Sequence, residues 1–279
     1  MDNLLLAGAL AAIALAERLP GLRFERSRFL RRYFCTDLFY LLSSGVGLAL
    51  VLREAGLRAA AAFGTLAPGF AALPPALEIA LAVVLYDVGA YASHLALHRV
   101  ETLWRFHKVH HSSQILDWLA TFRGHALEHA LRHLASAVLL LLVGFSLSAV
   151  AAAAAIYTAW AAFGHSNLGI DLRWAEPVLI TPRLHRLHHA AGTSERNLGT
   201  IFSLWDRLRG NLVTDPNAPL TPLGVPGELE TYPQSWLPQL VEPLLSWPRP
   251  SGADAWRANL EAAPRMSRTS DSCDLRSST

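Results

Sequence analysis

The chain has 279 residues, of which 52% are hydrophobic and only 16% charged, and its formal net charge is +2. With a positive mean hydropathy, this composition argues against an ordinary soluble domain and favours an integral membrane protein. The two cysteines, Cys35 and Cys273, are too few and too far apart to organise a disulfide framework.

Four apolar runs predict membrane helices, for which about 20 residues are needed. They are residues 4–16, 34–52, 76–97 and 126–163. The first extends to residue 19 if Glu17 and Arg18 snorkel, and it suits an anchor better than a signal peptide because no small-residue cleavage site follows. The last would measure about 57 Å as one helix, against about 30 Å of hydrocarbon. We therefore predict that it folds at 144–148 into a hairpin of two helices.

The remaining segments complete the expected organisation. Residues 57–73 are apolar but contain glycine and proline, which favours a re-entrant or interfacial segment. The loop 21–32 carries five arginines, which marks it as cytoplasmic. We expect four regions: 1–75 with the N-terminal membrane helices, 76–215 as a catalytic domain, 216–265 as an extension and 266–279 as a disordered tail.

Eight of the twelve histidines fall into three clusters with the patterns HxxxH, HxxHH and HxxHH. They are His94, His98; His107, His110, His111; and His185, His188, His189. Residues three and four apart share a helix face, so each cluster is expected to direct its imidazoles at one spot. Eight imidazoles exceed the four to six donors of one ion, so the count predicts two metals. Since no cysteine lies near, we favour two iron ions, with zinc as a possible substitute in purified protein.

Further polar residues lie between and beside the clusters. His165 lies at the end of the predicted hairpin. His125, Glu128 and His129 match the HxxEH pattern of some zinc peptidases, but a supporting role beside the ligands is the preferred interpretation. The residues expected to support the ligands rather than bind metal are Asp87, His125, Glu128, His129, Asn167 and Asp206. Asp87 is the strongest of these carboxylates because it lies in a membrane segment.

Five segments together carry a resemblance to a known family. They are 103–113 (LWRFHKVHHSS), 121–123 (TFR), 181–189 (TPRLHRLHH), 197–199 (NLG) and 204–208 (LWDRL). Over residues 80 to 212 the chain resembles the fatty acid hydroxylase superfamily, the membrane sterol desaturase and hydroxylase group. The resemblance implies a non-haem di-iron centre, oxygen as oxidant and a lipid-like substrate. Family members often have a further histidine between the second and third clusters, sometimes as HxxxH, so the resemblance makes His165 the expected ninth ligand. Here Gly169 stands where the second histidine would be, so one coordination position has no assigned residue.

These observations predict an all-α membrane protein with about 4–5 transmembrane helices and a cytoplasmic, histidine-rich helical cap that holds a di-metal centre. The expected activity is O2-dependent hydroxylation or desaturation of a lipid, with electrons from a separate donor protein because no dinucleotide fingerprint is present. We expect a multi-pass protein of a bacterial inner membrane, with no nucleic-acid partner. A membrane metal transporter and a metal-dependent intramembrane peptidase are the alternatives, and substrate identity stays open.

Overall fold

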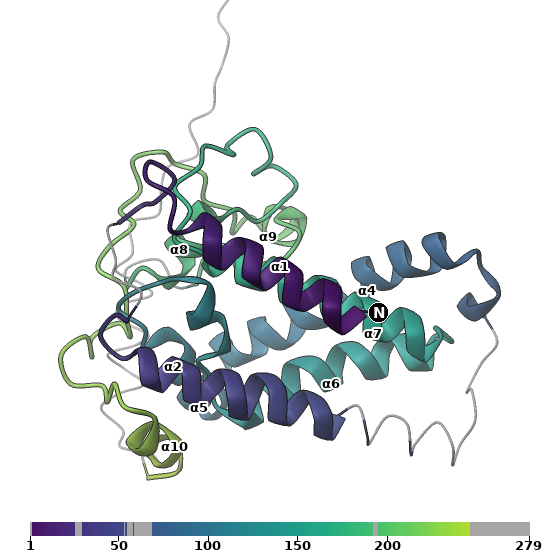
Figure 1. Cartoon of the computed structure of the whole chain (residues 1–279), viewed down its shortest axis with the longest axis horizontal. Coiled ribbons are helices and arrows are strands. Elements are labelled where there is room, and N and C mark those ends of the chain that lie inside the picture. The colour runs from purple at the N-terminus through teal and green to yellow at the C-terminus, as the bar shows by residue number, and fades with distance from the viewer. Residues whose placement is uncertain are drawn as a thin grey trace, which may run out of the picture.

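The computed structural model describes residues 2–25, 30–52, 69–191 and 195–245, together with Glu54 and Arg58 (Figure 1). Within these residues the regular structure is helical. Strand pairing is limited to three isolated bridges, such as that between Leu179 and Phe202, and no sheet forms. The prediction of an all-α chain is confirmed. The expected disordered tail, and most of the segment expected to be re-entrant, lie outside the described residues.

Three described helical stretches are long and apolar enough to cross a bilayer: Phe34–Leu52, Pro75–Arg99 and Leu147–His165. The first begins as α2 (Phe34–Tyr40) and continues through a π-helical stretch (Leu41–Gly47), while the others are α4 and α7. α1 (Asp2–Ala16) and α6 (Ala126–Leu142) run beside them (Figure 1). With 15 and 17 residues, these two rise only about 22 and 25 Å, short of the hydrocarbon thickness. A count of four or five spans therefore stays a prediction.

Small residues allow the central helices to pack closely. α4 packs against both α6 and α7, and the core between them contains Ala82, Ala90 and Ala153. At Gly89 an added Cβ would lie 2.8 Å from the Cα of Ser136 on α6. Close backbone approach at small residues is typical of helix pairs in membranes, where dispersion contacts must replace the hydrophobic effect.

The long apolar stretch breaks into two helices, as predicted. The break covers residues 143–146, slightly before the expected 144–148, because Ser146 caps α7 and accepts a hydrogen bond from the Ala149 amide at 3.2 Å. Gly144 takes the positive φ of 90° that reverses the chain. The Ser146 amide also donates to Glu78 at 2.7 Å. This contact ties the turn to the first residues of α4.

The shorter helices gather toward one end of the bundle (Figure 1). They are α5 (Glu101–His111), a 3-10 turn (Trp118–Phe122), α8 (Pro182–His189), α9 (Leu204–Arg209) and α10 (Trp236–Leu245). Val100 is extended, so the chain turns between α4 and α5 without a long loop. As a result, the last two turns of α4 and of α5 carry their histidines into the same volume.

Candidate metal centre

Nine buried histidines form two groups that could each hold a metal ion. The five-histidine group consists of His94, His98, His107, His111 and His188. The four-histidine group consists of His110, His165, His185 and His189. Within each group, one ring nitrogen per residue lies within 4.8 Å of all the others. The structure therefore brings together all nine histidines that the sequence predicts as ligands.

The helices divide their histidines in a regular way. Each of three helices places a pair of histidines four residues apart in one group. The pair on α4 (His94, His98) and the pair on α5 (His107, His111) belong to the five-histidine group. The pair on α8 (His185, His189) belongs to the four-histidine group. The remaining histidine of each HxxHH motif, His110 or His188, crosses to the other group. The expectation that each cluster points at one spot is therefore wrong for both HxxHH motifs. On a helix, residues i+3 and i+4 are about 100° apart around the axis, so they face different neighbours.

The ring nitrogens in each group are closely spaced. The Nε2 atoms of His94, His98 and His107 lie 3.0 to 3.2 Å apart. In the other group, His165 Nε2 is 3.2 Å from that of His110 and 3.0 Å from that of His185. All nine side chains belong to residues at most 4% exposed, so bulk water does not hydrate them. The two groups adjoin each other, since the rings of His111 and His189 stack with centroids 4.5 Å apart.

Five of the nine rings have their Nδ1 atoms fixed by neighbours. Four of these nitrogens donate to main-chain carbonyls: His94 to Leu198, His110 to Arg123, His165 to Ala161 and His188 to Arg196, at 2.7 to 3.0 Å. His107 Nδ1 lies 2.9 Å from Glu128 Oε1. A carbonyl or an ionised carboxylate accepts hydrogen bonds only, so each Nδ1 carries the hydrogen. In neutral imidazole the lone pair then belongs to Nε2, which faces the group.

This tautomer assignment leaves lone pairs facing each other. His94 and His107 approach with Nε2 atoms 3.1 Å apart, and His110 and His165 with Nε2 atoms 3.2 Å apart. Neither pair can form a hydrogen bond if both Nδ1 atoms carry the hydrogen. A cation placed between the lone pairs would turn this repulsion into attraction. Each group contains one such pair, so the donor set fits one metal ion per group.

Burial keeps the cap imidazoles in the neutral form that binds metals. It lowers the pKa of the six histidines on α5 and α8, in the case of His188 to about 3, and the neighbouring imidazoles add to the effect for most of them. For His107 the Glu128 carboxylate opposes this shift but does not cancel it. Three of these residues also have ring nitrogens that find no hydrogen-bond partner among the described residues: both nitrogens of His111, His188 Nε2 and His189 Nδ1.

Among the predicted supporting residues, Glu128 is hydrogen-bonded directly to the side chain of one of the nine grouped histidines, His107. Its Oε1 accepts from His107 and also from Arg132 Nη2 at 2.5 Å, one helical turn away on α6. Burial would raise the pKa of this carboxyl, but His107 and Arg132 outweigh burial and lower it to about 2. The side chain is therefore a carboxylate, and it orients His107. Arg132 was missed by the sequence analysis, although its i,i+4 spacing from Glu128 is a usable signal.

The loop after α8 orients two further ligands through its backbone. Asn197 has a positive φ of 54°, which places the carbonyls on either side of it toward His188 and His94. Asp206 fixes this loop by accepting from the Gly199 amide at 2.7 Å and from Tyr91 at 3.2 Å. Main-chain carbonyl acceptors of this kind leave no mark on the sequence, and asparagine's tolerance of a left-handed conformation is the only available hint.

The other predicted supporting residues act at a distance from the rings. Asp87 accepts from the amides of Ile201 and Phe202 and from the indole of Trp205, at 2.8 to 3.1 Å, so it holds the same loop. Asn167, expected to support the ligands, instead pairs with the backbone of Glu25.

The residues of the peptidase pattern have other partners. His125 caps α6 through its Nδ1, which accepts from the Leu127 amide at 3.2 Å. His129 lies outside both groups, with its ring stacked on His133 at 6.4 Å, and Glu128 is bonded to His107. The three residues therefore form no site of their own among the described residues.

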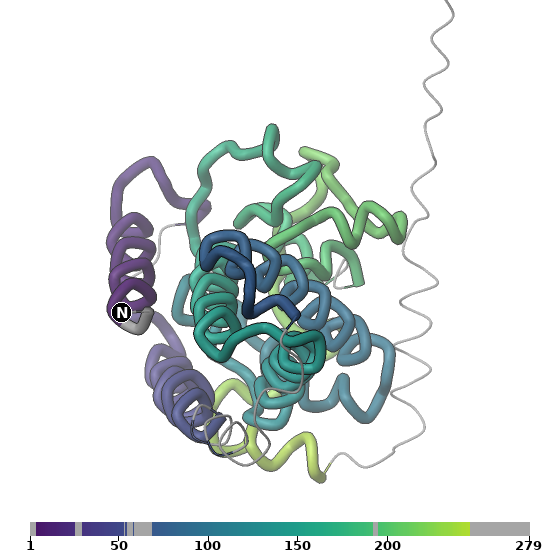
Figure 2. Tube along the Cα trace, turned by 90° about the vertical axis from the view of Figure 1, so that its right-hand side faces the viewer, coloured from purple at the N-terminus to yellow at the C-terminus, as the bar shows by residue number. Residues whose placement is uncertain are grey.

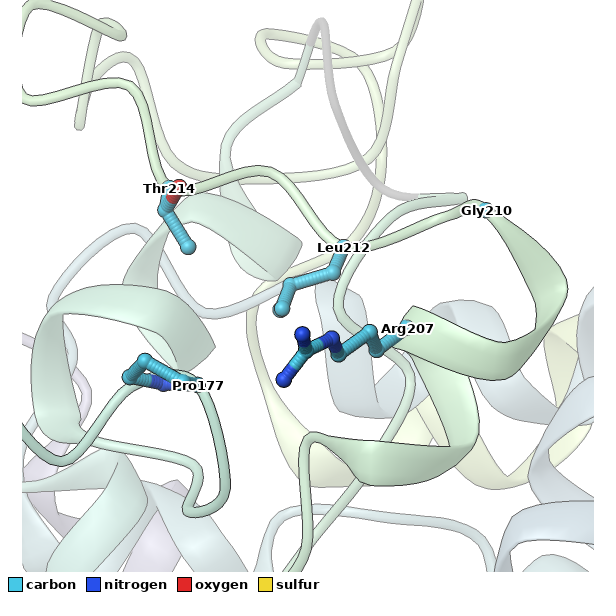
Figure 3. Close-up of a pocket in the computed structure, with 5 residues that line it drawn as sticks. All are labelled: Pro177, Arg207, Gly210, Leu212 and Thr214. Carbon is cyan, nitrogen blue, oxygen red and sulfur yellow. The ribbon is translucent and has the colours of Figure 1, made fainter.

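A surface pocket of about 360 Å³ lies beside α9 and is separate from the metal groups (Figure 3). Its lining consists of Pro177, Arg207, Gly210, Leu212 and Thr214. None of the nine histidines lines it, so it is not the opening of the metal centre.

Comparisons with known proteins identify relatives. The model of the family described as fatty acid hydroxylase matches residues 79–211. Ornithine lipid hydroxylase OlsE of Rhizobium tropici is 29% identical over 172 residues, which cover 61% of this chain and 51% of that protein. Alkylglycerol monooxygenase of Danio rerio is 30% identical over 138 residues, which cover 48% of this chain and 30% of that protein. The chain thus spans about half, or less, of the length of these relatives. No solved structure matched the chain.

Proposed function

We propose that this chain, whose residues 79–211 form a fatty acid hydroxylase domain, is an integral membrane oxidoreductase that hydroxylates a lipid with oxygen at a non-haem di-iron centre. The observation that carries the proposal is the division of nine buried imidazoles into two groups, each with one pair of facing lone pairs. We assign one ion to each group. The five- and four-histidine sets are then the metal ligands, and the position expected from the family's HxxxH motif stays without a residue.

Iron is favoured over zinc by the spacing of the donors. Nitrogens about 2.1 Å from one ion lie about 3.0 Å apart at right angles and about 3.4 Å apart at tetrahedral angles. The Nε2 separations of 3.0 to 3.2 Å are on average closer to the first value. They favour five- or six-coordinate ions, which iron and manganese accept and structural zinc seldom does. Zinc can still replace iron during purification, because it binds such donors more tightly.

The names of the relatives point to the substrate class. One name specifies an ornithine lipid and the other an alkylglycerol, and both names denote insertion of oxygen. We therefore favour hydroxylation of an acyl or alkyl chain of a polar membrane lipid over desaturation or a sterol substrate. The overall reaction consumes the C–H bond, O2, two electrons and two protons, and yields C–OH and water. The electrons would come from a separate redox protein.

Iron ions bound in the two groups would supply the activation of oxygen. The chain's own contribution is to hold the donors ready. Leu198, Arg196, Arg123 and Ala161 carbonyls and the Glu128 carboxylate fix the rings before any ion binds. Burial excludes water, which protects an oxidising centre from side reactions. Such preorganisation means that little rearrangement is needed when the metals bind.

The alternative functions have less support. A transporter needs ligands that open to one side and then the other near the middle of the bilayer. Here the donors lie at the end of α4, at the end of α7 and in the cap, all buried. A peptidase at His125 and His129 would need Glu128 as its base, but that carboxylate is bonded to His107 and Arg132. We place the metal centre on the cytoplasmic side of a bacterial inner membrane on the strength of the arginine-rich loop alone.

The decisive experiment uses isotopically heavy oxygen. Purified protein is loaded with ferrous iron, placed in nanodiscs that contain a total lipid extract of the host, and supplied with a chemical or protein electron donor. Mass spectrometry should show a lipid that has gained one heavy oxygen atom. Zinc-loaded protein is the matched control, because it has the same fold and ligands but no redox chemistry. Lipid analysis of cells with and without the intact gene then identifies the natural substrate. If iron-loaded protein with a working donor labels no lipid, the proposal is wrong.

A further inference from the structure

Helix α10 presents an apolar face away from the protein. Leu237, Val241, Leu244 and Leu245 occupy positions i, i+4, i+7 and i+8, and their exposed fractions run from 40% to 77%. The buried residues of the helix are Gln239 and Pro243. A surface helix of a soluble protein has the opposite arrangement, with its apolar stripe toward the core. The outward face of α10 therefore needs an apolar partner.

The inward face is fixed to the protein by specific contacts. Gln239 is fully buried, and its Nε2 donates to Ser112 Oγ at 2.9 Å and to the Pro233 carbonyl at 2.7 Å. Tyr232 donates to Glu242 at 3.2 Å. A buried amide with satisfied donors holds the rotation of the helix about its axis. Because these contacts fix the rotation of α10, its leucines remain exposed while the helix is packed against the protein.

The apolar face of α10 adjoins the candidate membrane span Phe34–Leu52. The indole of Trp236 stacks on the ring of Phe39 in that span, with centroids 4.3 Å apart and planes at 22°. Along the same span, Leu42 and Val46 are exposed by 60% and 48%. The exposed apolar residues of the span and those of α10 are therefore joined by an aromatic contact between Phe39 and Trp236.

The direction of α10 fits the surface of a membrane. Figure 1 shows α1, α2 and α6 along the long axis of the molecule and α10 nearly end-on. Figure 2, turned by 90°, shows the bundle end-on and α10 lengthwise. The helix thus runs across the direction of the spans, at the cap end of α2. A helix that lies in the interface of a bilayer has this orientation relative to the helices that cross it.

We infer that α10 is a membrane-interface helix whose face of Leu237, Val241, Leu244 and Leu245 inserts into the lipid beside the span Phe34–Leu52. The helix contains no lysine or arginine, so apolar burial rather than attraction to anionic headgroups holds it there. The hydrogen bond from Gln239 to Ser112 also connects α10 to α5, because Ser112 directly follows His111. The membrane surface is thereby fixed relative to the five-histidine group.

Spin labels test the inference in the intact protein. In a background with Cys35→Ala and Cys273→Ala, single cysteines replace Leu237, Leu244, Val46 or Asn217, and the labelled proteins are placed in nanodiscs of zwitterionic lipid. Power saturation compares collisions with oxygen, which concentrates in lipid, and with a water-soluble nickel chelate. Val46 in the span is the lipid reference, and exposed Asn217 is the water reference. We expect the ratio of oxygen to nickel collisions at Leu237 and Leu244 to be several-fold above that at Asn217.

Each other result contradicts the inference in its own way. Labels at Leu237 and Leu244 that collide with nickel as often as Asn217 would place α10 in water. Labels that collide with neither reagent would show that protein, from another part of the chain or a second copy, covers the face. Should Val46 also read as water-exposed, the span itself would be wrong and the inference would fall with it. Because no reading depends on metal or activity, failure of the proposed chemistry would leave this test unaffected.

Discussion

Replacing Glu128 with glutamine should weaken metal binding at the five-histidine group without unfolding the protein. Glutamine has nearly the same shape as glutamate, so the side chain should keep its place beside His107 and Arg132. In the wild type, Glu128 Oε1 lies 2.9 Å from His107 Nδ1. The substitution removes the negative charge that interacts with His107 and Arg132. A neutral acceptor makes the His107 ring less basic and its orientation less firmly held, because the amide can turn its NH2 group toward the ring.

The magnitude follows from comparable changes at residues that support metal ligands. Such substitutions cost about 10- to 100-fold in metal affinity, equivalent to about 1.4 to 2.8 kcal/mol. Stability should fall as well, because Arg132 lies in a buried setting where its charge loses its carboxylate partner. Removal of one partner from a buried ion pair costs about 3 to 5 kcal/mol. We expect the lower end, since Tyr157 remains hydrogen-bonded to Arg132.

The assay is a competition titration with a chromophoric chelator, which resolves the affinities of the two metal equivalents. Glu78→Gln is the matched control, because Glu78 is also a buried carboxyl on a helix and accepts from the Ser146 amide at 2.7 Å, in the first turn of α4. It should cost stability and leave both affinities unchanged. Our reasoning is refuted if Glu128→Gln binds two equivalents as tightly as the wild type, or if Glu78→Gln weakens binding equally.

Three further predictions concern the parts that hold the cap. Asn197→Ala should lower the free energy of unfolding by about 1 to 2 kcal/mol because alanine tolerates the positive φ poorly, and further because the buried amide loses its hydrogen bonds to the backbone of Leu184 and Val213. Asn197→Gly should restore only the first part; thermal unfolding in detergent measures both. Gly199→Ala should destabilise more than either, since its Cβ would lie 2.4 Å from the Phe202 carbonyl oxygen, and a melting temperature equal to wild type would contradict this. Burial raises the pKa of Glu17 from 4.5 to about 7, so the folded protein keeps a proton that the unfolded chain releases. The free energy of unfolding should therefore fall by up to about 3 kcal/mol as pH rises from 4.5 to 7, and Glu17→Gln should flatten this profile.

The sequence predicts which histidines come together because their spacing is a local property. HxxxH and HxxHH place side chains near one helix face regardless of the rest of the fold, so eight of the nine grouped histidines could be named from spacing, and His165 from the family resemblance. The break near Gly144 could also be predicted, because a straight helix would have been too long for the membrane. In both cases a property of one short segment decides the outcome.

The partition of the ligands could not be predicted in this way. Whether His110 joins His107 or His185 depends on how α5 and α8 face each other, and that angle is set by packing between segments some 75 residues apart. Likewise, Asp87 was expected near a metal because a carboxylate in a membrane helix is costly. The loop at residues 201–205 folds back and supplies three donors to it instead. Tertiary contacts of this kind carry no periodic signal.

Adjacent residues on one helix test the partition directly. His110 and His111 are both buried, and they belong to different groups. His110→Ala leaves five imidazoles in one group and three in the other, whereas His111→Ala leaves four in each. A group of three neutral donors holds a divalent ion less firmly than one of four, so His110→Ala should retain one tightly bound equivalent and His111→Ala two. Metal analysis after dialysis against a chelator measures the content, and X-ray absorption gives the mean number of imidazole ligands per ion. If His111→Ala lost an ion while His110→Ala kept both, the assignment of these two residues to their groups would be wrong, and with it the rule that the i,i+4 pair of each helix stays together.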